Sequence, residues 1–209
     1  MISNSQHLDS KNYKKSTKNK SIINSKSFIS RKRKPPNRFY PSIRKECELC
    51  HKFLDSSLFP NHYNSHPTKI LDWLYLGTID NARDIEDLKR NNITNILNVA
   101  SECNNKKLPK NINEFHLKIK DSSDYQIINY FDEANEYIEK CREKGSNLLV
   151  HCKYGVSRSP AFILAYLIKY NKFNVDSALE FIKQKRNKIN PNYGFLCQLY
   201  KYEKIINKK

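Results

Sequence analysis

The sequence has no long apolar run and no apolar segment close to Met1. Its longest apolar stretch, residues 161–168, has eight residues, whereas a membrane-spanning helix needs about 20. A secretory signal peptide would need an apolar core near the amino terminus, which this sequence lacks. The common lipidation signals are also missing, because Gly does not follow Met1 and no Cys lies near the last residue. We therefore expect no membrane span and a cytoplasmic or nuclear location.

The sequence also lacks the features of a secreted disulfide framework. Six Cys are spread over 209 residues, and the polar amino terminus gives no reason to place them in an oxidising compartment. We therefore expect the cysteines to be free thiols.

Acidic residues are almost absent from the first 45 residues. This segment has 13 Lys or Arg and one acid, Asp9, so it carries +12 of the net charge of +17, and the remainder carries +5. It has few large apolar side chains, so burial cannot offset the entropy lost on ordering. We predict that residues 1–45 are a disordered basic tail. Its densest run, residues 31–34, suits a nuclear-import signal or a contact with nucleic acid or an acidic partner, or is simply a solvated charge run.

Residue types that bind metal follow the tail. Cys47 and Cys50 form a Cys-x2-Cys pair, and after eleven residues His62 and His66 form a His-x3-His pair. Tetrahedral Zn²⁺ accepts two thiolates and two imidazoles at such spacing. The segment resembles a small Cys2His2 zinc finger, and we predict a zinc-finger-like module with a structural zinc over residues 46–67.

Two features of this segment depart from the usual finger. The gap between the pairs is one residue short, and the position of Phe53 is irregular, although Phe53 and Leu58 would supply a small core. His51 is an alternative ligand. The competing interpretation is a linker that contains four unrelated Cys and His residues.

From residue 68 onward the apolar pattern alternates between the periods of strands and helices, which is typical of an α/β layer fold. A helix over 127–141 should end at Gly145, because glycine is the common residue just after a helix. The helix that begins near Pro160 is apolar on all sides and should be buried. The expected strands are residues 70–76, 93–99, 115–119 and 148–151, and further helices are expected around 82–88, 175–182 and 195–206.

The strongest functional signal lies in residues 148–160. A short apolar run ends in His151-Cys152, five residues separate Cys152 from Arg158, and Ser159-Pro160 is typical of a helix start, with Ser as N-cap. Backbone N–H groups at a helix start bind anions and favour a thiolate. The Arg158 fork can hold a tetrahedral oxyanion through two hydrogen bonds. The segment therefore predicts a phosphate-ester hydrolase with Cys152 as nucleophile.

The same residues carry a family resemblance. His151-Cys152-x5-Arg158-Ser159 is similar to the signature loop of cysteine-based protein phosphatases, and residues 155–159 resemble the dual-specificity branch. The resemblance covers about residues 68–209. It implies a catalytic domain with a central mixed, mostly parallel sheet flanked by helices, and catalysis without a metal or other cofactor. Further blocks that resemble the family are residues 73–77, 96–100, 121–131 and 191–195.

The resemblance also implies roles for single residues. Arg158 would bind the equatorial phosphate oxygens, and Ser159 would assist departure of the Cys152 thiolate, a plain N-cap being the alternative. Asp121 would be the general acid, with Asp124 as the competitor. Residues lining the phosphate-binding loop would be Lys153, Tyr154, Gly155, Val156, Ser157 and Arg158, and supporting residues would be His151, Asn98 and Asn192.

The substrate class is less sharply indicated. Lys153 adds positive charge at the mouth of the loop, which suits an acidic phosphopeptide, and Val156 stands where lipid phosphatases would have a basic residue. We predict a phosphatase that acts on phosphotyrosine and on phosphoserine or phosphothreonine in a protein partner. Alternatives are a phosphatase of RNA 5′ ends or phosphoinositides, or a non-catalytic adaptor that reads phosphate or binds nucleic acid. Cys141 and Cys197 are expected to be structural, whereas Cys103 in a polar loop is a candidate redox partner of Cys152.

Overall fold

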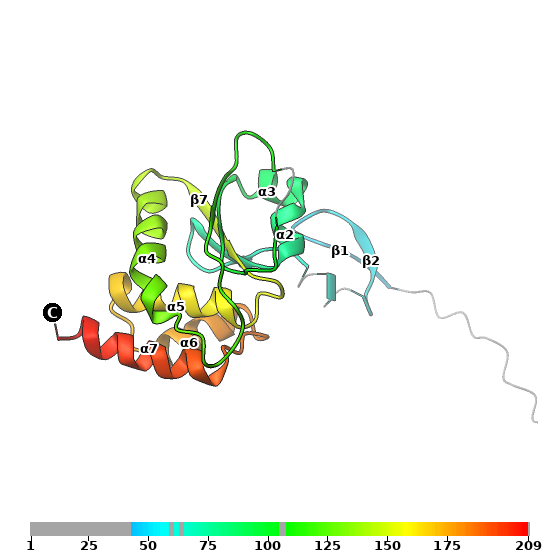
Figure 1. The fold of residues 1–209 in the computed structure, drawn as a ribbon. Coiled ribbons are helices and arrows are strands. Elements are labelled where there is room, and N and C mark those ends of the chain that lie inside the picture. The colour runs from blue at the N-terminus through cyan, green and yellow to red at the C-terminus, as the bar shows by residue number, and fades with distance from the viewer. Residues whose placement is uncertain (1–42, 59–60, 63–64, 105–107, 209) are drawn as a thin grey trace, which may run out of the picture. The chain divides into compact units, whose positions relative to one another are not determined.

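The computed structural model describes residues 43–58, 61–62, 65–104 and 108–208. The predicted basic tail, including residues 31–34, therefore lies outside the described residues except for its last three positions. Figure 1 shows a central sheet with helices on both of its faces. The predicted α/β class is confirmed.

The central sheet has five strands in the order β3-β4-β7-β5-β6. β3 pairs antiparallel with β4, and all other neighbours are parallel, so the sheet is mixed and mostly parallel as predicted. A separate two-stranded antiparallel sheet joins β1 to β2. The strands are β1 Arg44–Glu46, β2 Phe53–Asp55, β3 Thr68–Lys69, β4 Leu74–Gly77, β5 Ile93–Asn98, β6 Asn113–His116 and β7 Asn147–His151.

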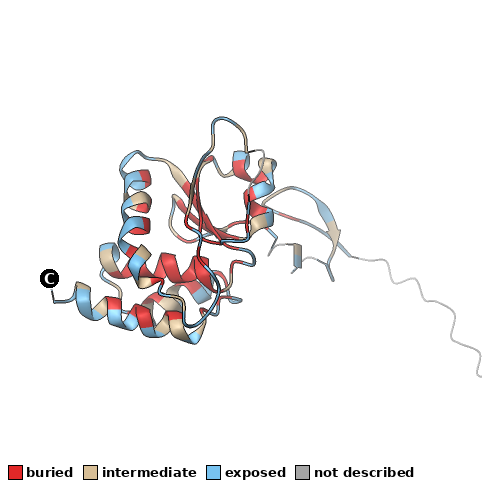
Figure 2. Ribbon diagram, viewed as in Figure 1, coloured by how far each residue is buried: buried red, intermediate tan, exposed pale blue. Residues whose placement is uncertain are grey.

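Alternating side chains on the strands build a core on each face of the sheet. Leu148 and Val150 of β7 belong to the larger core, which is shared with the four later helices, whereas Leu149 points to the other face and packs with Ala82 and Leu88. Figure 2 shows both cores as buried segments on the strands and on the inner sides of the helices. The helices are α2 Ile79–Arg83, α3 Ile85–Arg90, α4 Ile128–Glu143, α5 Arg158–Asn171, α6 Val175–Lys185 and α7 Tyr193–Ile206.

Helix α5 is buried from residue 158 to residue 168, which confirms the expectation from its uniformly apolar sequence. Helix α4 ends at Glu143 with Lys144 as its C-cap, and Gly145, the expected terminating glycine, follows with φ +64°. The Ser146 amide then donates to the Cys141 carbonyl at 2.9 Å and closes the helix. The burial of α5 and the end of α4 therefore follow from local sequence signals.

Three predicted elements differ from the structure. The strand expected over 70–76 is a turn followed by β4, because the Ile70 amide donates to the Leu74 carbonyl at 2.8 Å and reverses the chain. The helix expected around 82–88 is two helices, since Asp84 leaves helical geometry and its carboxylate accepts from the first amides of α3. The strand expected over 115–119 ends at His116, although Leu117 and Ile119 remain buried.

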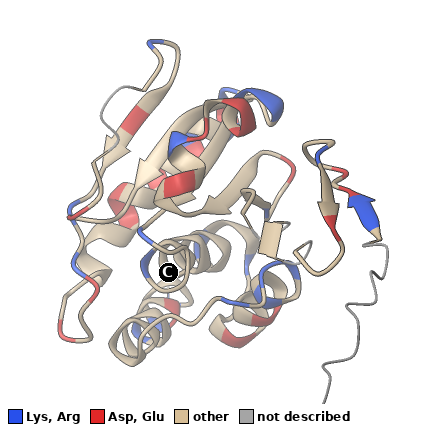
Figure 3. Ribbon diagram, turned by 90° about the vertical axis from the view of Figure 1, so that its right-hand side faces the viewer, with Lys and Arg blue, Asp and Glu red and all other residues tan. Residues whose placement is uncertain are grey.

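Charged residues of both signs are interspersed over the helices and strands of the described chain (Figure 3). This agrees with the small surplus of +5 that the sequence has after residue 45. Among the described residues, no helix combines the length and apolar character needed to cross a membrane.

Candidate active site

The loop over residues 152–157 joins the carboxyl end of β7 to the start of α5. β7 lies between β4 and β5, and His151 pairs with Gly77 on one side and with Asn98 on the other. Residues that follow these three parallel strands therefore meet at one edge of the sheet, where open α/β sheets bind ligands. This topology places the loop at the carboxyl end of the middle strand of the sheet.

Cys152 is 2% exposed, and its sulfur receives two hydrogen bonds. The Gly155 amide donates to Sγ at 3.3 Å, and the Ser159 hydroxyl donates at 3.2 Å. Donors of this kind complement a thiolate, because hydrogen bonds to the charged form favour it. The sulfur therefore lies in a setting suited to a nucleophile.

Gly155 makes the turn of the loop and has φ +65°. A Cβ at this position would lie 2.6 Å from the Gly77 carbonyl oxygen, closer than any non-bonded contact allows. The backbone thus requires glycine for two independent reasons, its left-handed conformation and the proximity of β4.

Of the two roles predicted for Ser159, the structure does not support that of N-cap. Helix α5 begins at Arg158, and Ser157 is the N-cap residue. Ser159 therefore lies inside the first turn, and its hydroxyl is bonded to Cys152 rather than capping the helix. Pro160 is tolerated because the first-turn amides of a helix have no intrahelical partner.

Arg158, the first residue of α5 after the loop, is 2% exposed. Its two terminal nitrogens donate to the two carboxylate oxygens of Glu102, each at 2.6 Å. Nη1 also donates to the Ile119 carbonyl at 3.1 Å. The hydrogen bond from Arg158 lowers the pKa of Glu102 to about 2. Within the described chain the buried Nε makes no hydrogen bond, and the Asp121 carboxylate lies 3.5 Å from it.

Sequence reasoning missed Glu102. Its signal was an acid four residues after β5, the strand that neighbours β7 in the sheet. Asn98 supports this loop, since its side-chain amide donates to the Cys103 carbonyl at 3.0 Å and its oxygen accepts from the Ala100 amide at 3.2 Å. Asn98 is fully buried. The supporting position expected for Asn98 is thus a brace under the loop that carries Glu102.

Asp121 lies at the mouth of the loop. The Ser157 hydroxyl donates to its Oδ1 at 2.7 Å, and the Asn192 amide donates to the same atom at 3.0 Å. Its other oxygen lies 3.5 Å from Arg158 Nε. Asp124 is exposed and bonded to the Ser122 hydroxyl instead. The structure therefore brings Asp121, and not Asp124, to Ser157 of the loop and to Arg158.

The remaining loop residues form its outer surface and its base. Lys153 Nζ lies 5.1 Å from the centre of the exposed Tyr154 ring. The Val156 carbonyl accepts from the Asn190 amide at 2.8 Å. His151 is fully buried, which lowers its pKa to about 4, and Nδ1 lies 3.3 Å from the Cys152 carbonyl. His151 is thus an uncharged side chain at the strand end from which the loop starts.

Arg186 is a second buried guanidinium beside the loop that the sequence did not reveal. Its Nε donates to the Gly155 carbonyl at 3.2 Å, and Nη1 donates to the Thr68 hydroxyl at 3.0 Å. It follows α6 in a run of charged residues, where an exposed side chain was the natural expectation. Arg186 fixes the turn at Gly155 and adds positive charge close to the catalytic loop.

Cys103 is buried, and burial raises the pKa of its thiol. Cys141 is also buried with a raised pKa, whereas Cys197 is exposed. All six cysteines of the sequence lie in the described chain as free thiols.

The four predicted metal ligands converge. The ligand atoms of Cys47, Cys50, His62 and His66 all lie within 4.8 Å of one another. The two imidazole Nε2 atoms are 3.3 Å apart, Cys50 Sγ is 3.1 Å from His62 Nε2, and Cys47 Sγ is 3.7 Å from His66 Nε2. A tetrahedron with metal–nitrogen bonds of about 2.0–2.1 Å separates two nitrogens by about 3.3 Å. The donor set and its spacing fit zinc.

Two details of the module differ from the prediction. His51 is exposed, and its Nδ1 lies 2.9 Å from the Glu46 carboxylate, so it is not a member of the cluster. Phe53 and Leu58 are 63% and 56% exposed and form no small core. A two-stranded sheet of three-residue strands is too small to enclose them.

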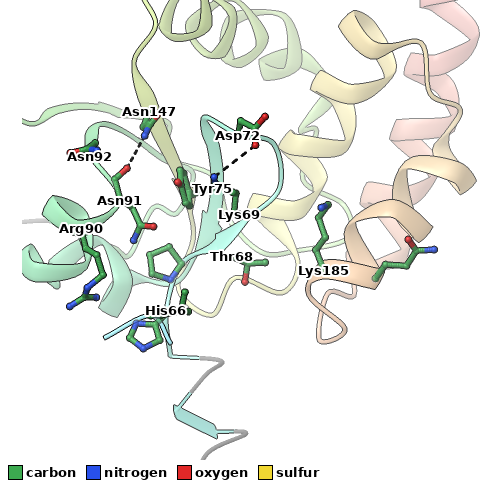
Figure 4. A pocket seen from close by; sticks show the side chains of 13 residues that line it. His66, Thr68, Lys69, Asp72, Tyr75, Arg90, Asn91, Asn92, Asn147 and Lys185 are labelled. Atoms are coloured by element: carbon green, nitrogen blue, oxygen red, sulfur yellow. Dashed lines mark hydrogen bonds and ion pairs between the residues drawn. The ribbon is translucent and has the colours of Figure 1, made fainter. Parts of the chain in front are cut away.

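A polar pocket of about 820 Å³ lies away from the catalytic loop. Figure 4 shows that Asn92 and Asn147, at the amino ends of the parallel strands, line it together with His66, Lys69 and Lys185. Since the catalytic loop lies at the carboxyl ends of these strands, this pocket is separate from it.

The domain that carries the loop is similar to known proteins. Residues 74–205 match the family model described as dual specificity phosphatase, catalytic domain. The chain is 38% identical over 141 residues to Protein phosphatase Slingshot of Drosophila melanogaster, and 38% identical over 147 residues to human Dual specificity protein phosphatase 5. These matches cover 68% and 70% of this chain, but only 13% and 38% of the relatives.

The fold is also similar to a solved structure. The crystal structure of DUSP15 superposes with a TM-score of 0.62 at 31% identity, and the match covers 69% of this chain and 97% of that one. The region before β4 lies outside the family match.

Proposed function

This chain belongs to the family of dual-specificity phosphatase catalytic domains, and from that premise we propose that it is a protein phosphatase that hydrolyses phosphotyrosine and phosphoserine or phosphothreonine. One observation supports the reaction above all. The buried Cys152, whose sulfur receives two hydrogen bonds, lies at the same loop as the Arg158 guanidinium and the Asp121 carboxyl, which is 3.5 Å from Arg158 Nε. These are a nucleophile, an oxyanion binder and a proton donor.

In the first step the Cys152 thiolate attacks phosphorus. The sulfur–phosphorus bond forms, the phosphorus–oxygen bond to the substrate breaks, and Asp121 gives its proton to the leaving oxygen. Arg158 Nε and the loop amides bind the equatorial oxygens, whose charge they stabilise. Glu102 and the Ile119 carbonyl occupy the opposite edge of Arg158, so they hold the guanidinium in its orientation.

In the second step a water molecule attacks the cysteinyl phosphate. The Asp121 carboxylate accepts the proton of this water, the sulfur–phosphorus bond breaks, and the sulfur leaves as a thiolate. The Ser159 hydroxyl is already bonded to that sulfur at 3.2 Å, so it stabilises the departing charge. Asn192 and Ser157 keep Asp121 at the mouth for both steps.

The test is hydrolysis of p-nitrophenyl phosphate by the full chain. We expect turnover in the wild type and a loss of at least about 10³-fold in Cys152→Ser. Equal activity in both proteins would refute the mechanism. An inactive wild type that still binds phosphopeptides would instead favour the adaptor function.

The breadth of substrates needs its own measurement. Dual specificity is the activity named for the human relative, Dual specificity protein phosphatase 5. The exposed Tyr154 beside Lys153 offers an aromatic and cationic rim for an acidic phosphopeptide. Turnover of matched phosphotyrosyl, phosphothreonyl and phosphoseryl peptides tests it. Hydrolysis of the phosphotyrosyl peptide alone would restrict the proposal to a tyrosine phosphatase.

A structural zinc is the second component of the proposal. Its ligands would be Cys47, Cys50, His62 and His66, whose spacing fits a tetrahedral ion. Four protein ligands fill the coordination shell, so this zinc would serve the fold and not the hydrolysis. Elemental analysis of the purified chain should find one zinc per molecule in the wild type and less in Cys47→Ser.

The location and the tail remain part of the proposal. We expect a cytoplasmic or nuclear protein whose basic residues 31–34 contact an acidic partner such as nucleic acid or direct nuclear import. Imaging of the tagged chain with and without residues 1–42 tests this. An unchanged distribution would remove the import signal from the proposal.

A further inference from the structure

The zinc ligands are connected to the catalytic domain through a buried carboxylate. His66 Nδ1 lies 2.6 Å from Oδ2 of Asp87, and the side chains are 8% and 2% exposed. Asp87 belongs to α3, inside the segment that matches the phosphatase family. We propose that Asp87 is part of the zinc centre as the carboxylate that accepts a hydrogen bond from the ligand His66. Residues 46–67 would then supply the ligands, and the catalytic domain would supply the carboxylate that orients one of them. The inference depends on the zinc site proposed above.

The two nitrogens of His66 face different partners. Nε2 faces the ligand cluster, 3.3 Å from His62 Nε2 and 3.7 Å from Cys47 Sγ. Nδ1 faces Asp87. A histidine that ligates zinc through one nitrogen commonly donates the other N–H to a carboxylate, which fixes its tautomer and increases its basicity as a ligand. Asp87 therefore sets which nitrogen of His66 faces the metal.

Asp87 is held in position by the start of α3. Asp84 caps this helix, and its carboxylate accepts from the Asp87 amide at 3.0 Å. The next residue, Leu88, is fully buried against the sheet. Arg90 also donates to the Asp87 carboxylate. A buried carboxylate needs such partners, because burial of an unpaired charge is costly.

The backbone around His66 is also attached to the catalytic domain. The Asn81 side chain of α2 donates to the Ser65 carbonyl. Thr68, two residues after His66, accepts the hydrogen bond from Arg186, which also donates to Gly155 in the catalytic loop. His66 and Arg90 line the same pocket at this junction (Figure 4). The centre is thus built onto the domain and is not an independent finger on a linker.

The test compares zinc affinity, measured by competition with a chromogenic chelator, in the full chain. Asp87→Asn should bind zinc about 10–100-fold more weakly than the wild type, since outer-shell partners contribute that much to metal affinity. Glu86→Gln is the matched control, because it removes the same charge from an exposed neighbouring position on α3. It should leave zinc affinity unchanged.

Arg90→Met distinguishes the contribution of the Asp87–His66 contact to zinc affinity from that of the Asp87–Arg90 ion pair. If Asp87 served only to pair with Arg90, this variant would weaken zinc binding as much as Asp87→Asn. We expect it to keep zinc affinity within about threefold of the wild type. Equal losses in the two variants, or wild-type affinity in Asp87→Asn, would overturn the proposal.

A measurement on the wild type needs no variant to fold. Long-range ¹H–¹⁵N spectra of the zinc-loaded chain should show His66 with a protonated Nδ1 and a metal-bound Nε2. Metal bound through Nδ1 would overturn the role of Asp87. Hydrolysis of p-nitrophenyl phosphate is recorded in parallel, so that failure of the zinc centre is distinguished from failure of the phosphatase.

Discussion

Replacement of Glu102 by Gln tests how Arg158 is positioned. The pair is bidentate, with both contacts at 2.6 Å, and Arg158 is buried. Gln keeps the shape of the side chain but removes its charge. It can accept only one of the two hydrogen bonds, so one of the two contacts between this side chain and the buried guanidinium is lost.

The pKa of Glu102 gives the size of the effect. The hydrogen bond with Arg158 lowers this pKa from an ordinary value of 4.5 to about 2. At about 1.4 kcal/mol per pH unit, the difference corresponds to roughly 3 kcal/mol. The Glu102 side chain is 43% exposed, so solvent screening reduces the contribution to about 1–2 kcal/mol. We expect Glu102→Gln to be less stable than the wild type by this amount at neutral pH.

The pH dependence has a definite sign. Because the pKa of Glu102 is lower in the folded chain, its stabilisation is fully present above pH 4.5 and is lost as the pH falls through about 2. The difference between wild type and Glu102→Gln should therefore be constant from pH 7 to about pH 4.5 and shrink only below that. Urea unfolding across this range measures it.

Glu143→Gln is the charge-matched control, since Glu143 is exposed at the end of α4. It should change the free energy of unfolding by less than about 0.5 kcal/mol. The kcat of Glu102→Gln should also fall, by about tenfold, because a mobile Arg158 stabilises the transition state less well. Wild-type stability at pH 7, or a difference that disappears between pH 7 and pH 5, would refute the reasoning.

The other predictions concern the loop itself. Asp121→Asn should lower kcat about 10²–10⁴-fold, whereas Asp124→Asn should retain activity; steady-state kinetics in which the second variant is the impaired one would reverse the assignment. Ser159→Ala should slow release of phosphate from Cys152, so that a burst of product and a trapped phosphoenzyme appear in rapid-quench measurements; a lower kcat without a burst would place Ser159 in the first step instead. Gly155→Ala should lose activity and at least about 1–3 kcal/mol of stability, because a Cβ at φ +65° lies 2.6 Å from the Gly77 oxygen; unaltered thermal unfolding would contradict this.

The order of strands and helices after residue 68 was largely readable because the apolar periods are clear and the helices end at recognisable residues. The predicted elements differed from the structure where a local hydrogen bond redirected the chain. Asp84 divides one apolar stripe between two helices, and the turn after Ile70 converts an apolar run into a hairpin. In both places a local hydrogen bond competes with the apolar pattern, and the pattern alone does not reveal which prevails.

The sequence alone determined the reactive loop, because Cys152, its amide donors and Arg158 are contiguous and a strand followed by a loop and a helix forces them together. It also singled out the four candidate metal ligands, since two short Cys and His pairs suit one metal site. Tertiary structure alone decided the partners. Glu102 lies 56 residues from Arg158, Arg186 lies 31 from Gly155, and Asp87 lies 21 from His66. These pairs depend on the placing of β7 between β4 and β5 and on the packing of α3 and α6, which long-range contacts fix and local spacing does not encode.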